Sequence, residues 1–211
     1  MQRVVFHHRV SITVPLGVLG LVFSGGADSS LVLYQLLSQT QQPLHLFTVA
    51  VADRNYSHAQ AVFEIIKWAN TAFPNRIQTI EFDTWSSSEK GIANLFRRPS
   101  AALRDKTVNS IFTGITAHPP RDQHQKFVNY AAAFEWRERD PLRTRPVERY
   151  KNWFTPYTNL NKQDLAQLYY DNQLMDSLFP LTRSCSSGEN FTHCGHCWFC
   201  EERIWAFRRL I

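Results

Sequence analysis

The sequence has no run of about 18 apolar residues, so we expect no membrane-spanning helix and no membrane partner. Residues 1–9 lack the apolar core of a signal peptide, and we therefore expect a cytoplasmic protein. Cysteine is also scarce, and all four cysteines fall between positions 185 and 200. Such a local cluster cannot cross-link a whole domain, and in a cytosolic chain it favours metal binding over disulfide bonds.

Internal repeats and low-complexity tracts are absent as well. Hydrophobic residues make up 44% of the chain and aromatic residues 13%, which is enough for a packed core and excludes disorder. A length of 211 residues suits one full α/β domain with a small appendage. The net charge of +5, with an isoelectric point near 9.2, suits a phosphate-bearing ligand or nucleic acid.

Short apolar segments alternate with helical patterns along the chain. We expect strands at 18–23, 46–51, 77–82 and 110–116. We expect helices at 29–39, 62–73, 101–108, 127–134 and 162–170, the last one capped by Asn161. The first 20 residues are predicted to be extended, and 84–99 to form a loop. This order predicts an α/β fold with a doubly wound, mostly parallel sheet (1–180) and a small C-terminal zinc-binding subdomain with a terminal helix (181–211).

The segment Ser24-Gly25-Gly26-Ala27-Asp28-Ser29-Ser30 follows the first expected strand and opens the first expected helix. An open α/β sheet binds its ligand at this place, where a strand ends and a helix N-terminus begins. The two glycines let main-chain N–H groups approach phosphate oxygens, and the three serines add hydroxyl donors. A carboxylate repels phosphate, so Asp28 is expected to hold Mg²⁺ or to cap the helix. A plain glycine turn at a strand–helix junction is the alternative interpretation.

The same segment lacks the lysine of a Walker A loop, which disfavours kinase or GTPase chemistry. It resembles the signature Ser-Gly-Gly-x-Asp-Ser of the N-type ATP pyrophosphatases, the PP-loop superfamily, at all six positions. The resemblance implies the adenine nucleotide alpha hydrolase-like fold and a reaction that splits ATP into AMP and pyrophosphate.

The four cysteines follow the pattern C-x8-C-x2-C-x2-C, formed by Cys185, Cys194, Cys197 and Cys200. Zinc takes four ligands in a tetrahedron, and closely spaced thiolates in tight turns supply adjacent corners. We predict a structural zinc site, with the nearby arginines at 183, 203, 208 and 209 offsetting the thiolate charge and with His193 and His196 as neighbours. An iron–sulfur cluster uses the same four thiolates and is the alternative, although nothing else in the sequence indicates redox work.

The segment 155–207 resembles the tail of the 7-cyano-7-deazaguanine synthase family. The matching residues are Pro156, Leu160, Lys162, Ser184, Cys185, Gly188, Cys194, Gly195, Cys197, Cys200, Glu202, Arg203, Ala206 and Phe207. Enzymes of that family use ATP to adenylate 7-carboxy-7-deazaguanine, and ammonia then displaces AMP to give an amide. A second ATP activates the amide oxygen so that a nitrile forms, and the nucleotide products leave with phosphate or pyrophosphate.

The resemblance implies a role for several residues. Pyrophosphate and Mg²⁺ would be held by Ser24, Gly25, Gly26, Asp28 and Ser29, with Ser30 as a further nucleotide-binding residue. Lys162 would balance charge on the phosphates of the activated intermediate. Val49 and Val51 would receive adenine, and Gly114 would lie under the nucleotide. The implied cofactors are ATP, Mg²⁺ and Zn²⁺, and the implied partners are a small deazapurine carboxylate and ammonia.

The middle of the chain departs from that family. Ile115–Asp122 keeps little of the family's Asp- and Tyr-rich segment, while Arg97–Pro99 and Asp53–His58 are weak counterparts of two further motifs. We therefore expect the activation chemistry to be kept and the acceptor pocket to have changed. A tRNA base or a protein as acceptor, for amination or thiolation, stays open, and so does a homodimer. A non-catalytic module in which Trp198 and Phe199 stack on nucleic-acid bases is a third interpretation.

We expect the acceptor pocket beside the phosphate loop, between 113–118 and 183–188. The acceptor carboxylate must come within ~3–3.5 Å of the ATP α-phosphorus, which fixes it near the carboxyl ends of the strands. His118, Arg121 and Arg183 are the candidates for binding an anionic acceptor, and ordinary surface charge is the alternative for each of them.

Overall fold

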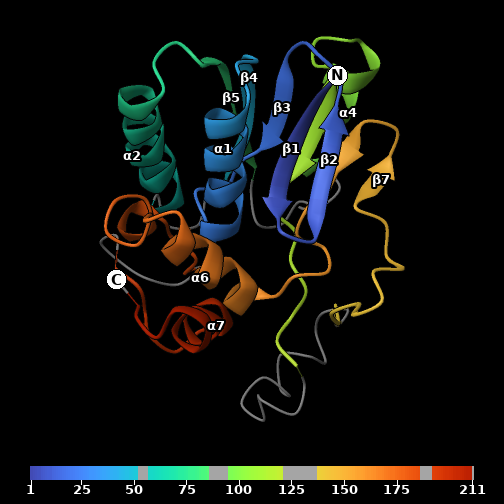
Figure 1. The fold of residues 1–211 in the computed structure, drawn as a ribbon. Helices are drawn as coiled ribbons and strands as arrows, with labels where there is room; N and C mark the ends of the chain where they lie inside the picture. The colour runs from blue at the N-terminus through green and yellow to red at the C-terminus, as the bar shows by residue number, and fades with distance from the viewer. Residues whose placement is uncertain (52–56, 86–94, 121–136, 186–191, 211) are drawn as a thin grey trace.

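The computed structural model describes residues 1–51, 57–85, 95–120, 137–185 and 192–210, with only the backbone at 49–51, 57, 58, 84 and 85. The helix expected at 127–134 lies outside these residues, as does Arg121. A six-stranded sheet with the order β5-β4-β3-β6-β8-β7 forms the centre of the molecule (Figure 1). Helices pack on both of its faces, as the alternating sequence pattern predicted.

The four expected strands are present and parallel. They are β3 (Leu19–Val22), β4 (Leu44–Val51), β5 (Ile77–Trp85) and β6 (Ser110–Thr113). Two further strands complete the sheet: β8 (Trp153–Phe154) pairs in parallel with β6, and β7 (Glu148–Tyr150) pairs antiparallel with β8. Strands of two or three residues are too short to show a periodic pattern, which is why the sequence did not reveal them.

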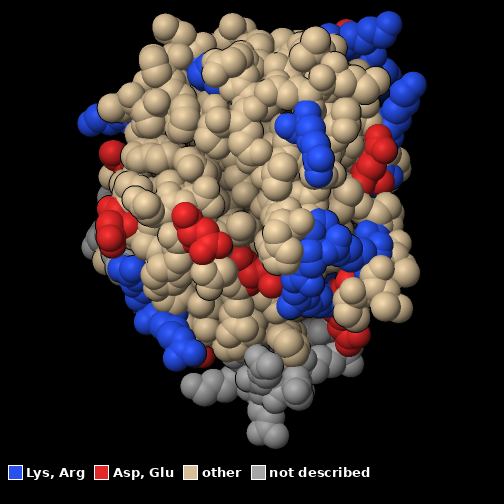
Figure 2. All heavy atoms as spheres, in the orientation of Figure 1, with Lys and Arg blue, Asp and Glu red and all other residues tan. Residues whose placement is uncertain are grey.

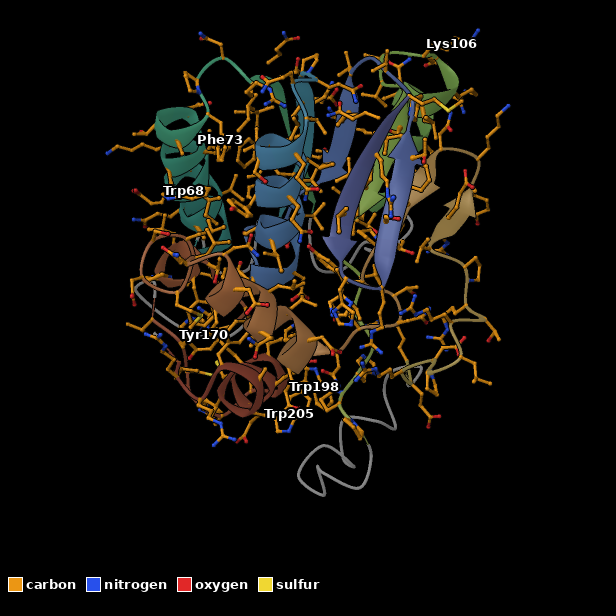
Figure 3. The ribbon with its side chains drawn as sticks, in the orientation of Figure 1. Trp68, Phe73, Lys106, Tyr170, Trp198 and Trp205 are labelled. Atoms are coloured by element: carbon orange, nitrogen blue, oxygen red, sulfur yellow. The ribbon has the colours of Figure 1, made fainter. Side chains whose placement is uncertain are left out.

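One face of the sheet is covered by α1 (Ala27–Gln39), α2 (Ser57–Ala72) and an N-terminal hairpin (Figure 1). Tyr34 of α1 lies against Trp68 and Phe73 at the α2 end, with ring centroids 6.5 and 6.3 Å away (Figure 3). The other face is covered by α4 (Arg97–Arg104), whose Ala102 packs in a second core with Ile111 of β6.

The predictions around α4 were wrong in detail. The expected loop 84–99 is strand at 84 and 85 and helix from Arg97 onward. The helix expected at 101–108 ends at Arg104, and Lys106 adopts a positive φ of 59°. A left-handed residue cannot continue a right-handed helix, so the chain turns there into β6.

The extended N-terminal segment forms a two-stranded antiparallel sheet of β1 (Gln2–His7) and β2 (Val10–Val14). The side-chain amide of Gln39 holds this hairpin to α1, because it accepts from the Val5 backbone N–H (2.8 Å) and donates to the Val5 carbonyl (2.7 Å). Phe6 stacks on Phe112 of β6, with centroids 5.7 Å apart. The hairpin therefore closes the core beside α1.

The C-terminal part contains α6 (Lys162–Asp171), a short 3-10 helix η3 (Phe179–Leu181) and α7 (Trp198–Phe207). The predicted cap of α6 is confirmed: Asn161 and Asp164 form a reciprocal capping box. Phe207 stacks on Phe179 at 4.2 Å and belongs to the main core. Among the described residues, no helix combines the length and apolar character needed to cross a membrane.

Candidate functional site

The phosphate loop lies between β3 and α1, at the carboxyl end of the strand that is flanked by β4 on one side and β6 on the other. After β3 the chain continues to β4, which pairs with one side of β3, whereas the later strand β6 pairs with the other side. The loop therefore lies at the topological switch point, where the strand order reverses. This is the ligand-binding position of open α/β folds. α6 and α7 lie beyond the carboxyl ends of these strands (Figure 1).

The two loop glycines have different backbone requirements. Gly25 adopts φ +72°, a left-handed conformation that favours glycine, whereas Gly26 has an ordinary φ of −80°. A Cβ at Gly25 would also meet the Val62 backbone nitrogen at 3.1 Å. The conformation of the loop therefore depends on glycine at 25 more than at 26.

Gly114 follows β6 and faces the first turn of α1. A Cβ at this position would lie 2.7 Å from the Ser29 backbone nitrogen and 2.8 Å from the Asp28 carbonyl carbon. Both are backbone atoms of a packed helix, which cannot rotate away as a flexible side chain would. Glycine at 114 thus allows close approach of the strand end to the phosphate loop.

The three serines of the loop also differ. Ser24 is exposed, and its hydroxyl lies 3.1 Å from that of the buried Ser29. Ser30 is fully buried and donates to the Gly26 carbonyl at 2.8 Å. The hydroxyl of Ser30 therefore stabilises the first turn of α1, and Ser24 is the loop serine that solvent can reach.

The N-terminus of α1 has no side-chain cap. Its N-cap residue is Gly26, and no side chain makes a capping hydrogen bond at this end of the helix. Asp28 lies in the first turn rather than at the cap, so the capping interpretation of this carboxylate was wrong. Uncapped N–H groups and the positive end of the helix dipole favour an anion at this position.

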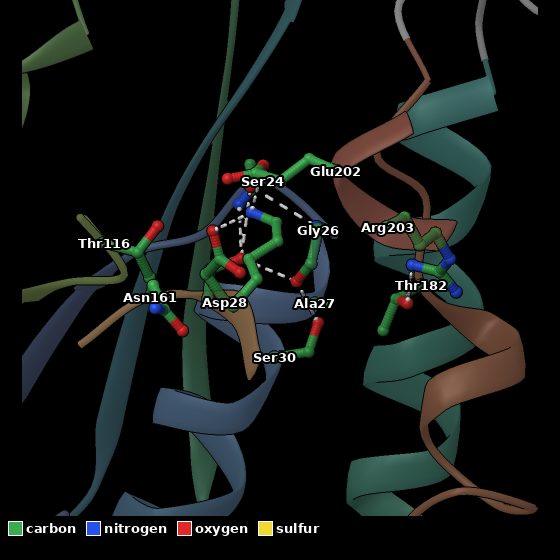
Figure 4. A network of polar contacts seen from close by, with 12 residues as sticks. Ser24, Gly26, Ala27, Asp28, Ser30, Thr116, Asn161, Thr182, Glu202 and Arg203 are labelled. Atoms are coloured by element: carbon green, nitrogen blue, oxygen red, sulfur yellow. Dashed lines mark hydrogen bonds and ion pairs between the residues drawn. The ribbon is translucent and has the colours of Figure 1, made fainter. Parts of the chain in front are cut away.

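Asp28 instead belongs to a buried charged network with residues from two distant helices (Figure 4). The Nζ of Lys162, the first residue of α6, lies 2.7 Å from Oδ2 of Asp28 and 3.1 Å from Oε2 of Glu202 on α7. The side chains of Lys162 and Glu202 are only 8% and 4% exposed. One ammonium group thus joins the phosphate loop, α6 and α7.

Burial alone would lower the pKa of Lys162, but the charges of Asp28 and Glu202 outweigh burial and raise it above its ordinary value. Burial raises the pKa of Glu202, and the neighbouring Asp28 carboxylate adds to this while Lys162 opposes it. Oδ1 of Asp28 is buried and has no hydrogen-bond partner among the described residues. The network therefore contains one ammonium group, two carboxylates and one unused carboxylate oxygen.

A second contact from α6 supports the same loop. The hydroxyl of the buried Tyr169 donates to the carbonyl of Ala27 at 2.8 Å. Together with Lys162, about two turns further back on α6, it fixes the beginning of α1 from one side. The proposed adenine residues Val49 and Val51 lie in the last part of β4, paired with Asp83 and Trp85 of β5.

Two of the three acceptor candidates lie next to this network. The Arg183 backbone N–H donates to the Gly25 carbonyl at 2.9 Å, and its guanidinium donates to the carbonyls of Pro180 and Thr182. His118 is 7% exposed and lies edge-on to the Trp198 ring at 5.6 Å. The segments around 118 and 183 therefore both reach the C-terminal helix.

His118 is a neutral side chain at pH 7. Burial, followed by the positive charges of Arg137 and Lys162, lowers its pKa to about 4. Its Nδ1 accepts from the Arg137 backbone N–H at 3.0 Å. The ring is therefore uncharged at neutral pH, and it would contact an acceptor through a hydrogen bond rather than through a full positive charge.

The four cysteines converge on one point. Their sulfur atoms all lie within 4.8 Å of one another, and the Cys194–Cys200 and Cys185–Cys197 pairs are both 3.9 Å apart. Gly195 takes φ +79° and provides the tight turn between the second and third cysteine. The sequence pattern thus forms a compact four-thiol site that can hold a metal.

Side chains around the thiols differ from the expected arrangement. Trp198 is 9% exposed and packs inside, whereas Phe199 is 40% exposed (Trp198 in Figure 3). Arg203 is fully buried over the Phe179 ring and donates to Thr182 Oγ1 (2.8 Å) and to the carbonyls of Phe179 and Leu210. Its guanidinium joins backbone segments, a role that the charge argument from sequence did not foresee.

Glu202 is the functional residue that sequence reasoning missed. The sequence offered one signal, because Glu202-Arg203 belongs to the resemblance described above. From its position in the helix alone, Glu202 would be predicted to be an ordinary exposed acidic residue. Its contact with Lys162 depends on how α6 and α7 pack, which no local spacing reveals.

A family model described as asparagine synthase matches residues 7–83. The matched segment runs from β1 through the phosphate loop to β5 and contains the whole Ser24–Ser29 signature. The chain contains a PP-loop domain. The phosphate loop described above is the PP-loop of this domain, and the predicted superfamily and fold class are confirmed.

Three solved structures resemble the chain at low identity. They are a U34-tRNA thiolase from Methanococcus maripaludis with a [4Fe-4S] cluster (13% identity, TM-score 0.43), an NH3-dependent NAD synthetase from Campylobacter jejuni (13%, 0.41) and an NMN synthetase from Francisella tularensis (17%, 0.35). The matches cover 77%, 80% and 78% of this chain, which spans 58%, 69% and 66% of those proteins. No curated protein matches the sequence.

Proposed function

We propose that this protein is an ATP-dependent ligase that adenylates a carboxylate at the PP-loop and transfers the acyl group to ammonia. The acceptor that we propose is 7-carboxy-7-deazaguanine or a related carboxylate, which is converted first to the amide. A second ATP would then activate the amide oxygen, which leaves bound to the phosphoryl or adenylyl group as the nitrile forms and the nitrogen loses its two protons. The observation that carries the proposal is the contact of Lys162 with Asp28, because Asp28 belongs to the phosphate loop and that loop lies in the segment matched by the asparagine synthase family. The name of that family denotes synthesis of an amide, in agreement with ammonia as nucleophile.

The phosphates of ATP would bind at the uncapped start of α1. The backbone N–H groups after Gly26 have no side-chain cap, and Ser24 and Ser29 add hydroxyls at the mouth of the loop. The acceptor carboxylate oxygen would attack the α-phosphorus while the bond to the leaving pyrophosphate breaks. The lone pair of ammonia would then attack the acyl carbon, and AMP would leave.

Mg²⁺ fits the charge of this site. The network of Asp28, Lys162 and Glu202 contains one positive and two negative groups, so its net charge is −1 when all three are ionised. A polyphosphate next to a negative cluster requires a further cation, and Oδ1 of Asp28 is a buried oxygen atom that has no hydrogen-bond donor in the described part of the chain. Mg²⁺ held there would offset charge on the phosphates, and Lys162 would fix the orientation of the Asp28 carboxylate.

We propose zinc for the cysteine site, within a subdomain formed by 181–211. Four thiolates at ~2.3 Å from one tetrahedral ion lie about 3.8 Å apart. Two of the sulfur pairs are 3.9 Å apart and all four sulfurs lie within 4.8 Å, which supports a single ion. A four-iron cluster places a separate iron on each thiolate and therefore requires wider spacing.

The acceptor would bind between the segment after β6 and the segment 182–185. His118 and Trp198, whose rings are in contact, would form one wall of this site. The segment of Arg183, whose backbone N–H donates to the Gly25 carbonyl, would form the other. Because Nδ1 of the neutral His118 ring accepts from the Arg137 backbone, Nε2 carries the proton and is a hydrogen-bond donor. We assign this donor to recognition of a heterocycle rather than of a negative charge. Arg183 and Arg121 keep their assignment to an anionic acceptor group.

The test is a direct assay. Purified protein is incubated with ATP, Mg²⁺, ammonium and 7-carboxy-7-deazaguanine, and products are identified by mass spectrometry. We expect AMP, pyrophosphate, the amide and the nitrile. Carboxylate-dependent exchange of labelled pyrophosphate into ATP isolates the adenylation step, and Asp28→Asn should abolish it. If wild-type protein shows neither exchange nor product with this carboxylate, the acceptor assignment is wrong.

An RNA acceptor is the second candidate, because arginines gather near the start of α6. Arg9 and Arg139 both pair with Asp164 (3.9 and 3.1 Å), and Arg143 donates to the carbonyl of Arg9. Figure 2 shows positive side chains grouped on this face of the molecule. Salt-sensitive tRNA binding together with tRNA-dependent pyrophosphate exchange would favour this candidate over the small carboxylate.

A further inference from the structure

Two adjacent residues of α7 reach the phosphate loop by different routes. Glu202 bonds to Lys162, and Lys162 bonds to Asp28 in the first turn of α1. The Lys162–Asp28 contact is 2.7 Å and the Lys162–Glu202 contact is 3.1 Å. The side chains of Lys162 and Glu202 are almost entirely buried. A displacement of Glu202 would therefore remove one of the two carboxylates that hold this ammonium group.

The second route runs through Arg203. Its guanidinium donates to Thr182 Oγ1 and to the Phe179 carbonyl, and so fixes the segment that follows η3. The next residue, Arg183, donates its backbone N–H to the carbonyl of Gly25. Gly25 is the loop residue with positive φ, so this hydrogen bond acts on the part of the loop with the least ordinary conformation.

The beginning of α7 belongs to the cysteine site. Cys197 is the N-cap residue of this helix and makes no side-chain capping hydrogen bond, and Cys200 lies in the first turn. Both are buried with Cys185, which follows Arg183 by two positions. At sites of this kind metal binding is coupled to local folding, so the ion would determine whether α7 is anchored.

We propose that the metal in the cysteine site controls the shape of the phosphate loop, with Glu202 as the positioning residue that transmits its presence. The metal-loaded cysteine site would hold α7 in place. In turn, α7 contacts Lys162 and the 179–183 segment, and these two contact Asp28 and Gly25. Metal and nucleotide then bind cooperatively, each raising the affinity of the other by the same factor. The inference rests on the proposed binding of ATP at the PP-loop and does not depend on the acceptor.

The experiment measures binding rather than turnover. Affinity for a non-hydrolysable ATP analogue with Mg²⁺ is determined by calorimetry for metal-loaded and metal-depleted protein, with circular dichroism to verify the fold. Zinc affinity is determined by competition with a chromogenic chelator, with and without the analogue. We expect metal removal to weaken nucleotide binding about tenfold or more, and nucleotide to strengthen zinc binding by an equal factor.

If the metal-depleted protein unfolds, its loss of nucleotide binding has no meaning, and variants of the zinc-loaded protein then test the link between the two sites. Glu202→Leu in the zinc-loaded protein should weaken nucleotide binding and reduce the coupling, and Glu202→Gln should restore part of both because its amide oxygen still accepts from Lys162. Glu64→Leu, at an exposed position of α2, is the control for loss of an acidic side chain and should leave both affinities unchanged.

Each result has one meaning. Wild-type protein that binds no nucleotide contradicts the proposed function itself. Nucleotide binding of equal strength with and without metal in folded protein, or a Glu202→Leu protein that matches wild type in affinity and coupling, overturns the link between the two sites while the ATP site stands.

Discussion

The ammonium group of Lys162 lies 2.7 Å from the carboxylate of Asp28, although 134 positions separate the two residues. Lys162 begins α6, where the helix dipole disfavours a positive charge, and it is 6% exposed. The carboxylates of Asp28 and Glu202 compensate both for the unfavourable helix dipole and for the burial of the ammonium group. The start of the phosphate loop helix is therefore held from the C-terminal half of the chain.

Replacing Lys162 by Met should destabilise the protein and abolish nucleotide binding. The variant leaves Asp28 and Glu202 as buried carboxylates without a cation, a change that typically costs about 3–5 kcal/mol. Urea denaturation and calorimetric titration with the ATP analogue measure the two effects. Lys151→Met, at an exposed position, is the control and should behave as wild type. A Lys162→Met protein of unchanged stability would show that the network does not hold the loop.

Gly114→Ala should be more damaging than Gly26→Ala. A methyl group at 114 would meet backbone atoms at 2.7 and 2.8 Å, whereas one at 26 would lie 3.3 Å from the Ser24 hydroxyl oxygen with an ordinary φ. We expect Gly114→Ala to lower the free energy of unfolding by about 1–3 kcal/mol and Gly26→Ala to change it far less. Equal losses in the two variants would mean that the strand end can move away from α1.

Purified protein should contain one zinc ion per chain and show no visible absorption from iron. Cys200→Ser should lose the metal and expose the segment after 180, because its thiol is one of four that lie within 4.8 Å of one another. Elemental analysis gives the metal content, and limited proteolysis reports the exposure. His196→Ala is the control and should keep its zinc, since this ring is exposed. An iron–sulfur spectrum in anaerobically purified protein would contradict the assignment.

Acid should destabilise the protein through His118. Its pKa is about 4 in the folded protein against 6.5 for the free side chain, so between these values the unfolded chain binds the proton more readily. The contribution of the neutral ring to the free energy of unfolding is complete above pH 6.5, and it is lost as the pH falls toward 4. His118→Gln should therefore show a flatter decline in unfolding free energy between pH 6.5 and 4, as measured in urea.

Histidine ring resonances provide an independent check of this shift. In ¹⁵N-labelled protein the His118 ring should keep the neutral form down to about pH 4. The groups that disfavour its protonation, Arg137 and Lys162, retain their positive charge throughout this range. Titration of the ring near pH 6.5 would show that it is not enclosed as described.

Much of the fold was predictable because its signals are local. The apolar run before Ser24, the glycine pair and the helical spacing after it identify the strand, loop and helix from fewer than 25 consecutive residues. The cysteine spacing likewise contains the information needed to bring four thiols together, and the structure does so. Local patterns fail where elements are very short, as for Trp153–Phe154, or end through one left-handed residue, as at Lys106.

The sequence by itself determined where the candidate phosphate loop and the four-thiol site lie, since each is built from residues that are close together in the chain. Only the tertiary structure decided how the sites are connected. Ser30 turns inward, Asp28 binds an ammonium group from α6, and Glu202 is buried against the same group. These roles follow from the packing of α1, α6 and α7, and packing depends on shape and burial summed over the whole chain rather than on any local spacing.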